Sequence, residues 1–225
     1  SYTLADINTL YTSASLGALL YADTTLDRTW FIRVLTGDYQ LNDENFSGEG
    51  MRNGNIQYLG LPLDNDYYGI RRSFWVATDN VYKSASQTYK NKLLALEKNK
   101  MNADDLPIAD FSKEEVVKIQ TGDSLLHFNL AKYKTLVKEA SKEFLSYPDI
   151  VNSSVSMFGF SGKFIFINSE GTQTTIIQNI LALYLQASML NEDGLEQVNQ
   201  LVYYYTKPED VPEVDAFKED AKQLV

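Results

Sequence analysis

The chain has 225 residues, a formal net charge of −10 and an isoelectric point near 4.6. Its length suffices for one large domain or two small ones, and no apolar run is long enough to span a bilayer. The absence of cysteine excludes disulfides and thiolate chemistry. Because 20 dispersed Lys and Arg are outnumbered by 30 Asp and Glu, the charge argues against binding to nucleic acid or to anionic membranes.

Residues 2–40 are predicted to form β-strands. Thr, Tyr and Leu are frequent in Tyr2–Leu10 and Tyr11–Tyr21, where Gly17 is a candidate bulge. Apolar residues on both faces of Trp30–Leu35 indicate a central strand, and Gly37-Asp38 marks a turn.

Residues 42–60 are rich in Asn and Gly and are predicted to form a long polar loop. A loop of this length is uncommon in a compact domain and tends to be functional or mobile. Two interpretations stay open: a flap or binding loop, and a disordered surface excursion.

Residues 64–100 are predicted to form one long helix, with Asp64 or Asn65 as its N-cap. Its apolar and aromatic residues recur at helical spacing and are expected to pack against a sheet, although the aromatic ones could instead form a ligand platform. They are Ile70, Phe74, Trp75, Val81, Tyr82, Ala85, Tyr89 and Leu93.

The segment 102–120 is interpreted as a connector. Ser112 followed by Glu115 matches a capping box, although Glu114–Ile119 could instead be a short strand. A second helix is predicted from Asn129 to Ser146, where Pro148 ends the pattern.

Residues 151–206 are predicted to form an antiparallel meander of four strands. Val151–Phe160 and Phe164–Ile167 are expected as separate strands. Asn168–Gly171 and Asn191–Gly194 are predicted hairpin turns, each with its glycine at positive φ. The amphipathic run Val214–Val225 is expected to begin a helix that leads into a further part of the protein.

Together these elements predict an α+β fold with antiparallel or mixed sheets, one long helix and one shorter helix, and room for two subdomains. We expect residues 1–110 to hold the early strands and the long helix. Residues 111–225 are expected to hold the second helix and the meander.

The sequence contains no complete catalytic, cofactor or metal site. A zinc site or a Ser-His-Asp triad would both need the single histidine, His127, which is expected to be a partly buried structural residue. Ser161 lacks the G-x-S-x-G spacing, and Gly162-Lys163 lacks the upstream glycine of a phosphate-binding loop. We therefore assign no catalytic, cofactor-binding or metal-ligating residue, and expect the isolated chain to bind no zinc tightly.

Three candidate pairs consist of carboxylate residues that are adjacent in sequence, but adjacency does not indicate a catalytic acid/base pair. Sequence neighbours do not face one another on a helix or strand, so solvated loops are the expected setting. The pairs are Asp104-Asp105, Glu114-Glu115 and Glu192-Asp193.

Several short segments, taken in order, resemble the TldD/PmbA family of zinc metallopeptidases, also described as modulators of DNA gyrase. The segments are Ser13–Gly17, Arg33–Tyr39, Leu61–Tyr68, Arg71-Arg72, Phe74–Asp79, Tyr82-Lys83, Ala109–Ser112 and Asn168–Gly171. The resemblance implies zinc bound through a His-Glu-x-x-x-His helix, peptide or unfolded-protein substrates, and assembly as a homo- or hetero-dimer. That zinc helix is not present in this sequence, so no catalytic residue carries over.

The resemblance leads to one functional expectation and one alternative. The chain is expected to be the non-catalytic amino-terminal, substrate-shaping and assembly region of a TldD/PmbA-like bacterial metallopeptidase, inactive alone, with zinc held elsewhere in the parent protein. The alternative is a stand-alone binding or scaffold domain without peptidase activity. A cytoplasmic location is favoured, with a periplasmic one open if an upstream signal peptide was removed.

Overall fold

Ten helices and strands and three short 3₁₀ helices make up the described residues of the computed structural model, which are 1–46, 56–122 and 124–224. In chain order they are β1 (Tyr2–Ser15), β2 (Ala18–Arg33), β3 (Ile56–Gly60), α1 (Tyr67–Lys98), η1 (Ala103–Asp105), β4 (Lys118–Thr121), α2 (Leu130–Ser141), η2 (Lys142–Ser146), β5 (Ile150–Ile167), β6 (Gln173–Leu190), β7 (Glu196–Tyr205), η3 (Pro208–Asp210) and α3 (Val214–Gln223). The predicted α+β class is confirmed. No helix among these residues is long and apolar enough to cross a membrane.

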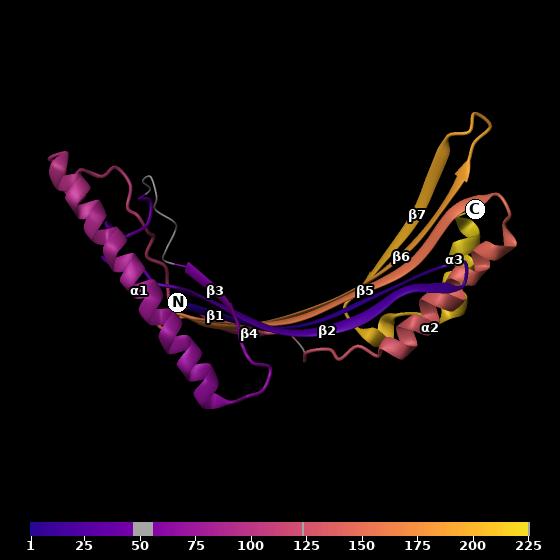
Figure 1. The fold of residues 1–225 in the computed structure, drawn as a ribbon, viewed down its shortest axis with the longest axis horizontal. Coiled ribbons are helices and arrows are strands. Elements are labelled where there is room, and N and C mark those ends of the chain that lie inside the picture. Colours follow the sequence, from indigo (N-terminus) through magenta and orange to yellow (C-terminus); the bar gives the residue numbers. More distant parts are fainter. Residues whose placement is uncertain (47–55, 123, 225) are drawn as a thin grey trace. The chain divides into compact units, whose positions relative to one another are not determined.

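The strands form one mixed sheet in the order β3-β2-β1-β5-β6-β4, and β7 also pairs with β6 (Figure 1). β4 runs parallel to the start of β6, with Lys118 opposite Gln173. β7 runs antiparallel to the rest of β6, from Leu181 opposite Tyr205 to Leu190 opposite Glu196. β6 therefore uses two successive stretches of its length for two different neighbours.

The chain divides into two compact units, each built from three stretches of sequence. Unit 1 comprises Ser1–Asp6, Asp27–Thr121 and Phe164–Ile176, and unit 2 comprises Ile7–Leu26, Gly122–Lys163 and Ile177–Val225. The long strands β1, β2, β5 and β6 contribute residues to both units. This partition differs from the consecutive parts 1–110 and 111–225 expected from sequence, because strands of 14 to 18 residues are long enough to serve two cores.

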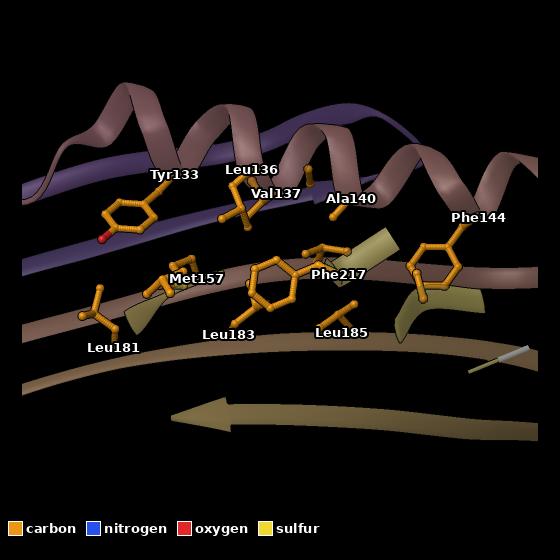
Figure 2. Close-up of a cluster of buried hydrophobic side chains, with 14 of the residues drawn as sticks. Tyr133, Leu136, Val137, Ala140, Phe144, Met157, Leu181, Leu183, Leu185 and Phe217 are labelled. Atoms are coloured by element: carbon orange, nitrogen blue, oxygen red, sulfur yellow. The ribbon is translucent and has the colours of Figure 1, made fainter. Parts of the chain in front are cut away.

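The core of unit 2 lies between α2, α3 and one face of the strands (Figure 2). Tyr133, Val137 and Phe144 recur at helical spacing along α2 and η2 and are almost fully buried. Alternate residues of β6, including Leu183 and Leu185, face them, and Phe217 of α3 completes the cluster. The predicted helix from Asn129 to Ser146 and the amphipathic pattern from Val214 are thus confirmed.

The core of unit 1 is smaller and forms between α1 and the early strands. Trp30 and Ile32 of β2 pack with Ala77 and Val81 of α1, and the Phe74 ring contacts Trp30 with centroids 4.1 Å apart and planes inclined at 51°. The long helix predicted over 64–100 is confirmed. Its N-cap is Asp66, whose carboxylate accepts the Tyr68 and Gly69 amides, rather than Asp64 or Asn65.

The first hairpin differs from the sequence prediction. β1 continues through Tyr11 to Ser15, and the chain reverses at Leu16-Gly17 with φ of 48° and 76°. Gly17 is therefore a turn residue rather than a bulge. Two successive positive φ values give the twist that a two-residue hairpin needs, and the Gly17 amide donates to Ser141 Oγ at 3.0 Å.

Three other predictions are corrected by the structure. Val151–Phe160 and Phe164–Ile167 belong to one strand, β5, so the predicted four-stranded meander has three strands, β5 to β7. Ser112 starts no helix, and β4 overlaps the alternative strand Glu114–Ile119 only at its end. The predicted loop 42–60 includes β3 at Ile56–Gly60, while its residues 47–55 lie outside the described residues.

Both predicted glycine turns are confirmed. Gly171 and Gly194 have φ of 104° and 77°. Each glycine amide donates to the carbonyl of the asparagine three residues earlier, Asn168 or Asn191. The Asn168 side chain also accepts the Thr172 amide at 2.9 Å, which explains why Asn opens the turn.

Candidate functional site

The residues that the sequence singled out for chemistry do not come together. His127 is exposed rather than partly buried, because the segment before α2 turns it away from the core. Ser161 is fully buried and bonds to structural partners: its Oγ accepts the Leu126 amide at 2.8 Å and donates to Asn179 Oδ1 at 2.6 Å. Ser161 thus holds the segment before α2 against the sheet.

The other sequence candidates are separated as well. Gly162-Lys163 lies inside β5 and forms no phosphate-binding loop. The three pairs of adjacent carboxylates are exposed and lie in different segments of the chain. Among the described residues, no three His, Cys, Asp or Glu side chains gather as a metal site would require.

Unit 1 contains a buried polar cluster that sequence reasoning missed. Lys92 forms an ion pair with Asp110, and both side chains are less than 10% exposed. Lys92 Nζ also donates to the Glu44 carbonyl at 2.7 Å, and Asp110 accepts the Asn42 amide at 2.8 Å. The cluster fastens the segment around Asn42–Glu44 to α1. No local pattern distinguishes Lys92 from the exposed lysines of α1.

Arg33 provides a second fastening for the same segment. Its guanidinium pairs with Glu44 at 2.6 Å and lies 5.2 Å from the centre of the Phe111 ring. Because Lys92 is paired with Asp110 and Arg33 with Glu44, each across two segments, the arrangement favours a structural role over a binding role.

Unit 2 presents a sheet face that its helices do not cover. Both α2 and α3 lie on the other face, where alternate strand residues form the core (Figure 1). Residues between those core positions point the opposite way, since successive side chains of a strand alternate. We call this surface the open face. Its members include Thr9, Tyr11, Ser13, Tyr21, Asp23, Thr25, Ser154, Ser156, Phe158, Phe160, Ile180, Ala182, Tyr184, Gln186, Ser188, Glu196, Val198, Gln200, Val202 and Tyr204.

The open face is aromatic and almost without charge. Tyr11, Tyr21 and Tyr204 are 47%, 50% and 64% exposed, and Phe158 and Tyr184 are each 37% exposed. The charged side chains among the members above are Asp23 on β2 and Glu196 on β7. A solvated sheet face in a chain with 22% charged residues would normally carry more of them. Depletion of charge with enrichment of Tyr is characteristic of interface cores.

Local contacts hold these tyrosines in place. The Tyr11 and Tyr21 rings are 5.5 Å apart, and the nearby hydroxyls of Thr9 and Thr25 lie 2.6 Å apart. Desolvation and a hydrogen bond with Tyr204 raise the pKa of the Tyr184 phenol. Ordered aromatic side chains can form contacts at little further cost in side-chain entropy.

The outer edge of β2 adjoins the open face. β3 pairs with β2 only from Thr29 to Arg33, so no strand among the described residues pairs with the outer side of Ala18–Thr24. We call Ala18–Thr24 the β2 edge. It contains no Lys, Arg or Pro, the residues that usually protect an edge strand, and Leu20 is 64% exposed.

Asp23 is the exception on the β2 edge. Its carboxylate accepts the Thr24 amide at 2.8 Å and the Tyr21 hydroxyl at 3.3 Å. That carboxylate raises the pKa of the Tyr21 phenol. Apart from the Thr24 amide, which Asp23 shields, the backbone groups along this edge can pair with an extended peptide. Such pairing depends little on the sequence of the peptide.

Comparison with known proteins identifies similar solved structures but no sequence relative. No protein-family model and no curated protein matches the sequence. A proposed modulator of a DNA gyrase from Thermotoga maritima MSB8 is similar, with a TM-score of 0.51, 12% identity, and coverage of 99% of this chain and 43% of that one. A proposed modulator of DNA gyrase from Bacteroides thetaiotaomicron VPI-5482 is also similar, with a TM-score of 0.54 and 7% identity. The match covers 99% of this chain and 44% of that one.

A third similar structure is TldE from Thermococcus kodakarensis, with a TM-score of 0.48 and 9% identity over 99% of this chain and 42% of that one. At such identities the Thermotoga and Bacteroides structures show a shared fold alone. The chain spans less than half the length of each of these three structures.

Proposed function

We propose that this chain is the non-catalytic, substrate-shaping and assembly region of a TldD/PmbA-like metallopeptidase that acts on peptides or unfolded protein. The observation that carries the proposal is the β2 edge, a run of strand whose outer side has no strand partner in the described part of the chain. Main-chain hydrogen bonds along such an edge accept an extended peptide, and they do so for varied sequences.

The fold comparison supports the same proposal. Two longer proteins described as gyrase modulators contain this fold within less than half of their length, as expected if the chain were one region of a larger enzyme. The resemblance implies zinc for such an enzyme. The described residues do not fit a zinc site, so we derive no catalytic step in this chain.

The open face supports the assembly part of the proposal. Two copies of a chain with a net charge of −10 repel each other over most of their surface. Repulsion is smallest at the open face, because its charged residues lie only on its outer strands. This face favours contact with another protein surface, whether a second copy or a related subunit.

Amide hydrogen exchange tests peptide capture. The protein is compared with and without an excess of an unstructured, uncharged peptide. We expect slower exchange in residues 18–24 and unchanged exchange in α1 and α2, because pairing protects only the amides along the edge.

A pair of variants makes this test specific. Leu20→Lys together with Ala22→Lys places charge along the β2 edge and should abolish the protection. The matched control is Leu195→Lys, which places a charge at a 65% exposed apolar residue just before β7, outside both the open face and the β2 edge. Protection confined to β7, or the same protection in the edge variant, would refute peptide capture at β2.

A further inference from the structure

One side of α1 exposes large aromatic residues at intervals of seven. Tyr68, Trp75 and Tyr82 are 76%, 71% and 56% exposed. Seven residues make almost two helical turns, so these side chains lie along one line, on the side of α1 that faces away from the buried residues Ala77 and Val81. Leu93, 41% exposed, continues it. We call Tyr68, Trp75, Tyr82 and Leu93 the α1 stripe.

The stripe corrects the expectation that the aromatic residues of this helix all belong to a core. Phe74 does pack on Trp30, but Trp75 and Tyr82 point away from that contact. Trp is highly buried on average, and the other tryptophan, Trp30, is 2% exposed. Exposed Trp and Tyr are the residue types that dominate the binding energy of protein interfaces.

The charge of α1 is opposite to that of the rest of the chain. The helix carries six basic residues, Arg71, Arg72, Lys83, Lys90, Lys92 and Lys98, and two acidic ones, Asp79 and Glu97, for a net charge of +4. The remainder therefore carries −10 − 4, or −14.

Two of these cations are already paired, whereas three others, which flank the stripe, have no ion-pair partner among the described residues. Lys92 is buried against Asp110, and Lys83 lies 2.6 Å from Asp79. Arg71, Arg72 and Lys90 are exposed. A second copy of α1 would bring like charges together, whereas an acidic helix would match them.

We propose that the α1 stripe docks an acidic amphipathic helix of a partner protein. Apolar residues of the partner, spaced by three and four, would pack on Trp75 and Tyr82. Its carboxylates would pair with Arg71, Arg72 and Lys90. This docking is independent of peptide capture at the β2 edge, which lies in unit 2.

The test uses two synthetic peptides of four heptads with Leu at a and d. One has Glu at e and g, and the other has Lys. Binding of the fluorescein-labelled peptides to the whole chain is followed by fluorescence anisotropy. We expect the Glu peptide to bind at least about tenfold more tightly than the Lys peptide and to weaken as salt rises.

Variants then locate the site. Trp75→Ala should weaken binding of the Glu peptide by about tenfold or more, as removal of a hot-spot residue does. Tyr58→Ala, at a 74% exposed tyrosine on β3, is the matched control and should leave it unchanged. Arg72→Glu with Lys90→Glu should shift the preference toward the Lys peptide.

Tryptophan emission gives a second readout without a label. Because Trp30 is buried, a blue shift on addition of the Glu peptide reports Trp75, and Trp75→Phe should remove it. Equal affinity for the two peptides, or binding that Trp75→Ala leaves unchanged, would overturn the proposal. So would concentration-dependent self-association that Trp75→Ala abolishes, since the occupant would then be a second copy.

Discussion

Lys92 shows at the scale of one residue how a charge comes to be buried. It lies on the same helix as exposed lysines, yet its ammonium group is enclosed by Asp110 and the Glu44 carbonyl. A buried ion pair pays a large desolvation cost for each ion, so its geometry and its additional hydrogen bonds decide whether it is tolerated.

Replacing Lys92 by Met should reduce the free energy of unfolding by about 3–5 kcal/mol, because the Asp110 carboxylate is then buried without its partner. Urea denaturation followed by circular dichroism measures the change. Lys83→Met, which removes the exposed pair with Asp79, should cost at most about 1 kcal/mol. Equal losses for the two variants would show that the Lys92 pair is not buried in solution.

Gly171 is a residue whose backbone conformation excludes a side chain. Its φ is 104°, although within the described part of the chain an added Cβ would meet only Val116 Cγ1, at 3.6 Å. Gly171→Ala should therefore destabilise by about 1 kcal/mol or more through backbone strain and not through a clash. The melting temperature measures this.

Gly60→Ala is the matched control for Gly171, because no atom of the described residues lies within 4 Å of a Cβ added at Gly60, and its φ is not positive. Its melting temperature should change little. An unchanged melting temperature for Gly171→Ala would contradict the assigned turn.

At the scale of an element, α1 begins where Asp66 accepts two backbone amides. Asp64, Asn65 and Asp66 are all acceptable N-cap residues, so sequence preference alone cannot choose among them. Contacts of the preceding segment determine which residue is the N-cap. Arg28 donates to the Asp64 carbonyl and to the Asn65 side chain, and these hydrogen bonds keep both residues outside the helix.

Asp66→Ala should destabilise the protein by about 1 kcal/mol, the usual cost of losing an N-cap side chain. Asp64→Ala should have a smaller effect because the carboxylate of Asp64 caps nothing in α1. Thermal denaturation of both variants tests the assignment. A larger loss for Asp64→Ala would place the start of the helix two residues earlier.

At the scale of the whole molecule, the four longest strands supply residues to both units. A strand that is ordered at one end and unfolded at the other loses cooperative hydrogen bonding along its length. We therefore expect the two units to unfold together in spite of their separate cores.

Val81→Ala in unit 1 and Val137→Ala in unit 2 test this coupling. Each removes two buried methyl groups and should cost about 2 kcal/mol. Emission of Trp30 reports unit 1, and far-ultraviolet circular dichroism reports both units. Both variants should lower one shared unfolding midpoint. Two separated transitions would contradict the coupling.

The candidate site was only partly predictable from sequence. A strand-rich composition favours sheet edges that can pair with an extended peptide, but it does not indicate which strand is left without a partner. That depends on β3 ending opposite Thr29 and on β1 running on to Ser15. The open face likewise depends on which side of the sheet α2 and α3 occupy, and strand periodicity alone does not specify that side.

The sequence by itself determined the α+β class, the three helices and the two Asn-x-x-Gly turns, because these follow from local periodicity and from backbone preferences of a few neighbouring residues. Only the tertiary structure decided that β5 runs unbroken through Gly162, that Lys92 is buried and that Trp75 is exposed. Each of these depends on contacts between residues far apart in the chain, and a local pattern carries no information about such contacts.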